Sequence, residues 1–244
     1  MMKRGSVLFL CILLAIAFVI PSMAFADEST ENLVSWVVES FDPEDRTTDW
    51  LVKGSKFITE GFPKQVYAKN WPESLWGYNT ENKDYEVLGV HARFDRKGYN
   101  NLEIIPVKDA GVEDWEHDPI ALRGRVKTFD LWVWGSMYDY DIEVHFLDYN
   151  GINWVLPLGN LKYSGWKNLT VDLPNYIPQA TKYIPYYKQL TFEKLVIWTS
   201  PQESVHEYYV YIDHLKILTD VFESRFDGDT LSWPEKINEI WGNE

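Results

Sequence analysis

The stretch Val126–Pro174, VKTFDLWVWGSMYDYDIEVHFLDYNGINWVLPLGNLKYSGWKNLTVDLP, contains the clearest hairpin signal in the chain. Before its middle, Ile142, Val144 and Phe146 alternate with polar residues, which is the period of a strand and not of a helix. The pair Asn150-Gly151 is the preferred sequence for a two-residue type I′ turn, because both central residues need positive φ. We therefore predict a β-hairpin whose loop is Asn150-Gly151.

This turn predicts a register in which Leu147 faces Trp154 and Phe146 faces Val155. One face of the hairpin is then apolar, as expected, but the other face is apolar near the turn as well. That second face would carry Leu147, Ile152, Trp154 and Leu156. A sheet with one face in water does not expose such a set, so a loop, the C-terminal tail or another molecule should cover it.

The N-terminus has the pattern of a secretory signal peptide. Lys3 and Arg4 precede an apolar run that is short for a membrane span, and Ala24-Phe25-Ala26 supplies a cleavage pattern. We expect residues 1–26 to be removed; the alternative is an uncleaved anchor. Cys11, the one cysteine, lies inside this run, so the mature chain should have neither a disulfide nor thiol chemistry.

Charge and composition exclude some partners. Without Lys3 and Arg4 the chain has 21 basic and 37 acidic residues, a net charge of −16. Such a surface repels nucleic acid, and after signal cleavage no segment predicts membrane binding. The content of 12 Trp, 15 Tyr and 12 Phe is high. Aromatic residues are typical of strands, of interfaces and of surfaces that stack on sugars.

The rest of the chain follows the same β pattern. Short apolar runs separated by turn residues predict an antiparallel β-sandwich of the jelly-roll type, like a carbohydrate-binding module, with long loops. The expected strands are 33–41, 50–58, 85–94, 101–107, 121–134, the two hairpin strands, 166–173, 192–199 and 206–218. Residues 85–94 and 101–107 look like a paired hairpin around Lys97-Gly98, and 59–84 like a long irregular segment. One sandwich domain over residues 27–229 is expected.

Residues 230–244 form a tail with the one helical signal. Trp233 precedes Pro234, which suits a first helical turn. Trp233, Ile237, Ile240 and Trp241 then recur at helical spacing on one side, which makes them a candidate anchor. An isolated helix of this length is marginal, so it should dock on its own sandwich or on a neighbour.

No motif predicts catalysis. The chain has no G-x-S-x-G, no glycine-rich phosphate loop and no H-E-x-x-H, and its five histidines lack ligand spacing. A glycosidase needs two carboxylates at a set separation, and no recognisable motif holds such a pair. We therefore expect no enzyme activity, no cofactor, no metal site and no catalytic residue.

From the hairpin onward the chain resembles the flagellar filament outer layer (sheath) protein family of spirochaetes, the FlaA type. The stretches that carry this resemblance are Leu131–Gly135 (LWVWG), Leu147–Gly151 (LDYNG), Leu156–Gly159 (LPLG), Tyr163–Leu169 (YSGWKNL), Ile177–Gln179 (IPQ), Phe192–Pro201 (FEKLVIWTSP), Tyr209–Asp220 (YVYIDHLKILTD) and Phe226–Gly228 (FDG). They cover about half of the mature chain in detail. The chain is short for this family.

The resemblance implies a periplasmic structural protein on the periplasmic flagellum. Such a protein coats the flagellin core and tunes filament shape and stiffness for motility. Its partners would be the core filament, other sheath proteins and, if the core is glycosylated, that glycan. The family carries no catalytic residues to transfer to this sequence.

Two other functions stay open. A carbohydrate-binding module without catalysis is the alternative, with Trp132, Trp134 and Trp154 available for stacking on sugars; a secreted glycoside hydrolase is the least favoured. Leu147, Trp154 and Leu156, with Trp132 and Trp134, are the candidate interaction patch. The alternative for this patch and for the tail anchor is that they cover each other within one subunit.

Overall fold

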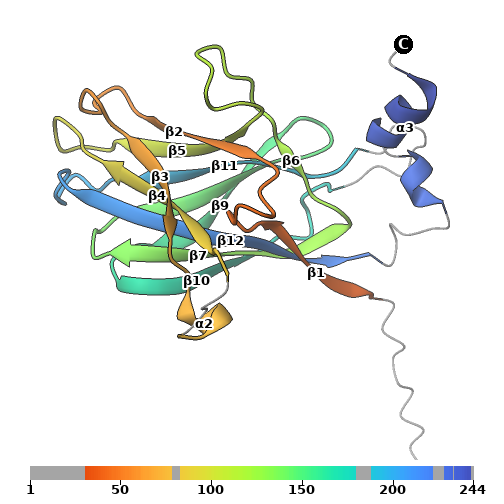
Figure 1. Cartoon of the computed structure of the whole chain (residues 1–244), viewed down its shortest axis with the longest axis horizontal. Helices are drawn as coiled ribbons and strands as arrows, with labels where there is room; N and C mark the ends of the chain where they lie inside the picture. Colours follow the sequence, from red (N-terminus) through yellow and green to blue (C-terminus); the bar gives the residue numbers. More distant parts are fainter. Residues whose placement is uncertain (1–30, 79–82, 180–187, 222–227, 233, 243–244) are drawn as a thin grey trace, which may run out of the picture. The chain divides into compact units, whose positions relative to one another are not determined.

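The computed structural model describes residues 31–78, 83–179, 188–221, 228–232 and 234–242. These residues form two six-stranded antiparallel sheets (Figure 1). Apolar side chains from both sheets fill one core, in which Phe192 packs against Trp50, Phe129 and Phe146. The predicted antiparallel β-sandwich is confirmed.

The first sheet, sheet A, has five strands in line and a sixth beside its long central strand. The order is β10 (Ser164–Asp172), β7 (Arg125–Ser136), β12 (Tyr208–Asp220), β4 (Glu86–Ala92) and β3 (Lys64–Lys69), with β1 (Leu33–Glu39) also paired to β12. The second sheet, sheet B, has the order β2 (Asp49–Gly54), β5 (Asn101–Val107), β11 (Thr191–Trp198), β8 (Asp141–Leu147) and β9 (Asn153–Asn160), with β6 (Ile120–Ala121) also paired to β11. β9 is an edge strand, which suits Pro157 because proline has no N–H for a further ladder.

The strand alternation seen in the sequence is reproduced in burial. On β8, Ile142, Val144 and Phe146 are buried in the core, whereas Glu143 and His145 are half-buried on the other face. This is why period two identified β8 correctly.

Two predictions about residues 59–107 are wrong. The segment 59–84 is not all irregular, because it contains β3 and the short helix α2 (Glu73–Trp76). The strands 85–94 and 101–107 do not pair, because β4 belongs to sheet A and β5 to sheet B. The connection between β4 and β5 crosses from one sheet to the other and is held by backbone hydrogen bonds to distant segments. Phe94 N–H donates to Val205 O, and Asp95 N–H donates to Phe57 O.

The β8–β9 hairpin forms where it was predicted, but its loop and register differ by one residue. Phe146 faces Trp154 and Leu147 faces Asn153. Gly151 N–H donates to Asp148 O and Asp148 N–H donates to Ile152 O, the pattern of a three-residue loop that ends in a bulge at Gly151, whose φ is 82°.

The physical reason for this register is the buried side chain of Asp148. Its carboxylate accepts hydrogen bonds from Asn150 N–H (2.8 Å), Ile152 N–H (3.0 Å) and Trp154 Nε1 (3.0 Å). Burial opposes the charge, but these hydrogen bonds outweigh it and lower the pKa of Asp148. The side chain of Asp148, two positions before Asn150, therefore selects the loop type.

The tail contains the predicted helix, α3 (Pro234–Trp241), preceded by a short 3₁₀ turn, η1 (Asp229–Ser232). Ile237 is half-buried, while Ile240 and Trp241 are 49% and 79% exposed. Trp233 and residues 1–26 lie outside the described residues. No helix in the described part of the chain has the length and hydropathy needed to span a bilayer.

Candidate interaction surfaces

The patch predicted around the hairpin is not assembled as one surface. Leu156 is buried and belongs to the core, and Trp154, on the same face, is half-buried against that core. Leu147 lies on the opposite face, because it follows the buried Phe146 on β8. The observed register pairs Trp154 with Phe146, which turns Trp154 and Leu156 inward. The outward side of β9 instead exposes Val155, and the loop exposes Ile152.

Trp154 has contacts within its own chain on two sides. Its Nε1 donates to Asp148, and its ring lies 5.6 Å from the ring of Tyr176, measured between centroids. With these contacts, Trp154 covers the edge of the core. Trp154 is therefore a weaker candidate for contact with a partner than the sequence suggested.

Trp132 and Trp134 do share a surface, the outer face of sheet A. Their neighbours on β7, Leu131 and Val133, point into the core, so both indoles lie on the opposite side, where they are half-buried. In the pairing with β10, Trp134 faces Trp166, and in the pairing with β12 it faces Tyr211. Three aromatic residues on three neighbouring strands thus form one row.

Further contacts hold this row, Trp166–Trp134–Tyr211, in place. The rings of Trp134 and Tyr211 meet edge to face at 5.5 Å, and Trp166 Nε1 donates to Asn70 Oδ1 at 3.3 Å. Gly89 continues the row on β4, and a Cβ there would lie 2.8 Å from the ring of Tyr211. The absence of a side chain at Gly89 is therefore what lets the Tyr211 ring lie over β4.

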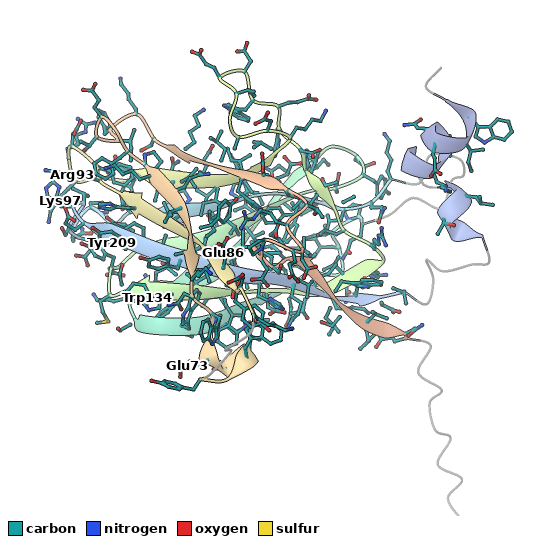
Figure 2. All side chains as sticks on the ribbon, viewed as in Figure 1. Glu73, Glu86, Arg93, Lys97, Trp134 and Tyr209 are labelled. Carbon is teal, nitrogen blue, oxygen red and sulfur yellow. The ribbon has the colours of Figure 1, made fainter. Side chains whose placement is uncertain are left out.

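A second aromatic pair lies next to this row. His91 and Tyr209, partners across β4 and β12, stack with centroids 4.1 Å apart. Tyr209 OH donates to Glu207 at 3.0 Å, and Ser136 Oγ, on the strand of Trp134, donates to Tyr209 O at 2.7 Å. Figure 2 labels Trp134 and Tyr209 on their strands. Stacked rings beside hydroxyl groups suit a ligand with flat apolar faces and hydroxyl edges, such as a sugar.

The same face of sheet A holds a buried carboxyl group, that of Asp213 on β12. It faces Trp132 across the β12–β7 pairing and is 3% exposed. Burial raises its pKa to about 8, and the nearby carboxyls of Asp42 and Glu39 act in the same direction. A neutral carboxyl group at neutral pH can donate a hydrogen bond.

A pocket of about 460 Å³ opens beside the end of β1. Trp76 and Tyr85, stacked at 4.9 Å, form part of its wall, and His214, at a backbone bulge with φ of 53°, meets Trp76 edge to face. Glu39 and Asp42 also line it, and burial raises the pKa of both.

These carboxyls already have structural partners. Trp50 Nε1 donates to Glu39, and Glu86 N–H donates to Asp42. In the described part of the chain, no group of three or more histidine, cysteine, aspartate or glutamate side chains is arranged to hold a metal ion. The described residues of the pocket therefore offer an aromatic wall and acidic oxygens.

Sequence reasoning did not single out Trp166, Tyr209 or Tyr211 as members of a surface. Each has the strand-alternation signal, so its outward direction was readable. Which strands lie side by side was not, because β7, β10 and β12 come from distant parts of the sequence.

The fold and these surfaces define an antiparallel β-sandwich with an aromatic outer face on one sheet. The family comparison identifies the group more closely: residues 38–227 match the family model described as flagellar filament outer layer protein FlaA. The chain belongs to this family.

Two relatives support this assignment. A protein of Brachyspira hyodysenteriae described as flagellar filament outer layer-like is 26% identical over 193 residues, 79% of this chain and 82% of the relative. The flagellar filament outer layer protein of Borreliella burgdorferi is 26% identical over 207 residues, 77% of this chain. The match spans 61% of the length of that second relative.

Solved structures that are similar include carbohydrate-binding modules. One from the β-sandwich superfamily has a TM-score of 0.43 and 12% identity, and the match covers 73% of this chain and 60% of that one. The module TmCBM61, solved with β-1,4-galactotriose, has a TM-score of 0.38 and 16% identity, with 70% and 88% covered. The ligands of these modules say nothing about what this chain binds.

Proposed function

We propose that this chain is a structural subunit of the sheath of the periplasmic flagellar filament, where it coats the flagellin core and tunes filament shape and stiffness. The observation that carries the proposal is the family match over residues 38–227. The signal-peptide pattern over residues 1–26 supports export to the periplasm.

Uncovered apolar side chains support a role in assembly. Trp36 and Val37 on β1 and Trp241 on α3 are large apolar residues left exposed by the described fold. Exposed apolar patches on an otherwise charged protein mark contact sites for other proteins. We propose that the core filament and other sheath proteins occupy such sites, and that the subunit is not an enzyme.

The test is deletion of the gene, followed by imaging of intact flagella in frozen cells. We expect filaments that are thinner or that have an altered helical waveform, and restoration of both by a plasmid copy. Purified flagella from the wild type should contain the protein. Filaments of unchanged diameter and waveform, or flagella free of the protein, would refute the proposed function.

A second candidate function, binding of carbohydrate without catalysis, is favoured by the row Trp166–Trp134–Tyr211. Glycan-array screening followed by calorimetry tests it, with Trp134→Ala as the binding-site variant. The exposed Tyr99, 80% accessible and outside the row, provides the matched control Tyr99→Ala. Binding that Trp134→Ala removes and Tyr99→Ala preserves would support this function; a screen without binding would remove it. Both functions hold together if the core filament carries a glycan.

A further inference from the structure

The pocket of about 460 Å³ beside the end of β1 has an excess of acidic side chains. Glu39, Asp42 and Asp45 line it, together with one basic residue, Lys83. Lys83 is exposed and makes no ion pair with any described residue. The carboxylate of Asp45 is exposed as well, and it has neither a hydrogen bond nor an ion pair in the described part of the chain. The lining therefore carries negative charge that its own basic residue does not neutralise.

A buried histidine adds a polar group without a partner to the wall of this pocket. His214 is 9% exposed, and its ring meets that of Trp76 edge to face at 5.6 Å. Neither ring nitrogen has a hydrogen-bond partner among the described residues. Burial lowers the pKa of His214, so its imidazole is neutral at neutral pH and one nitrogen can accept a hydrogen bond. Because a buried polar group without a partner is costly, this ring fits a ligand that donates to it.

The carboxyl groups around the pocket also oppose one another's charge. Burial raises the pKa of Glu39 and of Asp42, and both carboxyls in turn raise the pKa of Asp213. The guanidinium of Arg46 acts on Glu39, but it is already paired with Glu86 at 2.8 Å. A further positive charge in the pocket would stabilise the ionised carboxylates.

The aromatic wall suits a cation with an apolar stem. Trp76 and Tyr85 stack with centroids 4.9 Å apart, and Val37 and Val38 add aliphatic surface. Lys83 Nζ lies 5.6 Å from the centroid of Tyr85, so an ammonium group already reaches this wall. Ring faces attract ammonium groups within about 6 Å, and the methylene groups of an amine pack on apolar surface.

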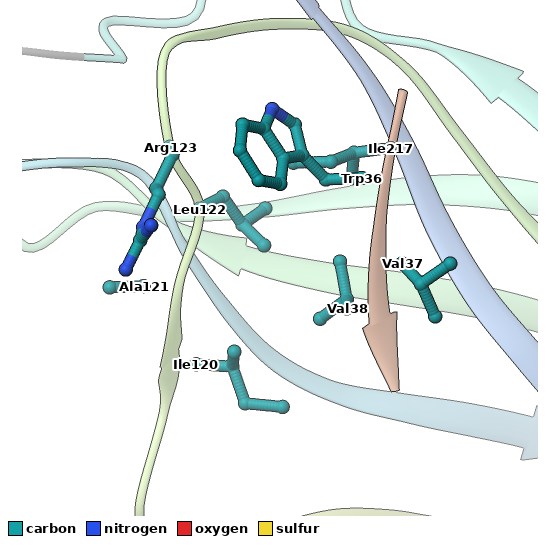
Figure 3. Close-up of a pocket in the computed structure, with 8 residues that line it drawn as sticks. All are labelled: Trp36, Val37, Val38, Ile120, Ala121, Leu122, Arg123 and Ile217. Atoms are coloured by element: carbon teal, nitrogen blue, oxygen red, sulfur yellow. The ribbon is translucent and has the colours of Figure 1, made fainter. Parts of the chain in front are cut away.

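A second pocket, which shares Val37 and Val38, lacks this charge. Its volume is about 240 Å³, and Figure 3 shows the residues that line it. They are apolar, as Trp36 and Leu122 are, except for the basic residue Arg123. Only the larger pocket therefore combines an aromatic wall with acidic oxygens.

We propose that the pocket lined by Asp45, Trp76 and His214 binds a primary ammonium group at the end of an aliphatic chain, from a free amine or from a lysine side chain of a partner protein. An ammonium group has three N–H donors and no acceptor. The lining offers carboxylate oxygens and an imidazole nitrogen as acceptors. The proposal goes beyond the sheath role and does not depend on it.

The test is an NMR titration of the isotope-labelled protein, purified as the cell produces it, with pentylammonium chloride. The indole N–H signal that disappears in Trp76→Ala belongs to Trp76. We expect this signal to shift in a saturable way with a Kd of about 1 mM, an affinity within reach of a ligand with so few atoms. Pentanol and methyl β-glucoside lack the charge and should bind about tenfold more weakly or not at all. The absence of a saturable shift, or a neutral probe that binds as tightly, would overturn the proposal.

Variants of opposite charge separate this pocket from a general attraction of cations to an acidic protein. Asp45→Asn should weaken binding about threefold, as expected for an exposed ion pair, and Lys83→Gln should strengthen it about twofold because a competing positive charge is lost. Glu44→Gln is the matched control, since it removes the same charge from the adjacent exposed residue, which does not line the pocket. It should bind like the wild type. Equal losses in Asp45→Asn and Glu44→Gln would overturn the proposal.

Further probes distinguish the sources of the ammonium group. Nα-acetyl-lysine N-methylamide represents a lysine within a protein, and cadaverine represents a free amine. The tighter of the two at the Trp76 signal identifies the source, and either result supports the proposal. Calcium chloride supplies positive charge without N–H donors, so at equal ionic strength it should not displace pentylammonium. Displacement by calcium would indicate a metal site and would overturn the proposal.

Discussion

The carboxyl group of Asp213 provides a prediction about pH and stability. It is almost fully buried on β12 opposite Trp132, and its pKa is raised from 3.8 to about 8, mainly by burial and further by the carboxyls of Asp42 and Glu39. No ion pair to it exists among the described residues. At neutral pH the folded protein therefore keeps a proton on Asp213 that the unfolded chain has released.

The sign of the effect follows from proton linkage. Between a pH well above 3.8 and a pH well below about 8, the unfolded state binds one proton fewer at this group. Stability must then fall as pH rises, by about 1.4 kcal/mol per pH unit. From about pH 5 to about pH 7, Asp213 alone should lower the free energy of unfolding by about 3 kcal/mol. Well below pH 3.8 this dependence of stability on pH disappears, because Asp213 is protonated in both the folded and the unfolded state.

The assay is urea unfolding at a series of pH values, for the wild type, Asp213→Asn and Asp213→Ser. The two substitutions differ in packing but both remove the titrating group, so both should flatten the profile by about 1.4 kcal/mol per pH unit. Glu39 and Asp42, whose pKa values are also raised, stay in all three proteins and cancel in the comparison. If both variants keep the wild-type slope, Asp213 is ionised in the folded protein and the reasoning is refuted.

Three further changes test the packing. Asp148→Ala should destabilise by about 2 to 4 kcal/mol in urea unfolding, because it removes three hydrogen bonds including that of Trp154; Asp148→Asn should cost less, and equal losses would contradict this account. Gly89→Ala should cost about 1 to 3 kcal/mol and change the near-ultraviolet circular dichroism, because the new Cβ would lie 2.8 Å from the Tyr211 ring; an unchanged spectrum would argue against that contact. Phe192→Ala should cost about 3 to 5 kcal/mol by calorimetry, since its fully buried ring packs at the centre of the core, and a loss typical of a surface residue would show that the core is elsewhere.

Much of the fold was readable from local sequence. The alternation in Ile142–Phe146 identified β8, and Pro234 with the apolar spacing after it identified α3, because each signal depends on residues a few positions apart. The hairpin loop was misread because Asn150-Gly151 fits two loop types. A buried acceptor, Asp148, decides between them.

The candidate surfaces were less predictable. The outward direction of Trp132 and Trp134 follows from strand alternation and was anticipated. Their neighbours Trp166 and Tyr211 were not, since strand order depends on which distant segments pair. The one-residue difference in register moved Trp154 and Leu156 from the outside to the core, because each step along a strand reverses the face.

The β architecture and the acidic charge were readable in the linear chain, because composition and short-range periodicity survive without a folded context, and the family was readable from the resemblance of short stretches to its known members. The tertiary structure alone decided the aromatic row on sheet A, the raised pKa of Asp213 and the uncovered edge at β1. Each of these depends on residues brought together from distant positions, and burial and proximity are properties of the packed chain and not of the sequence order.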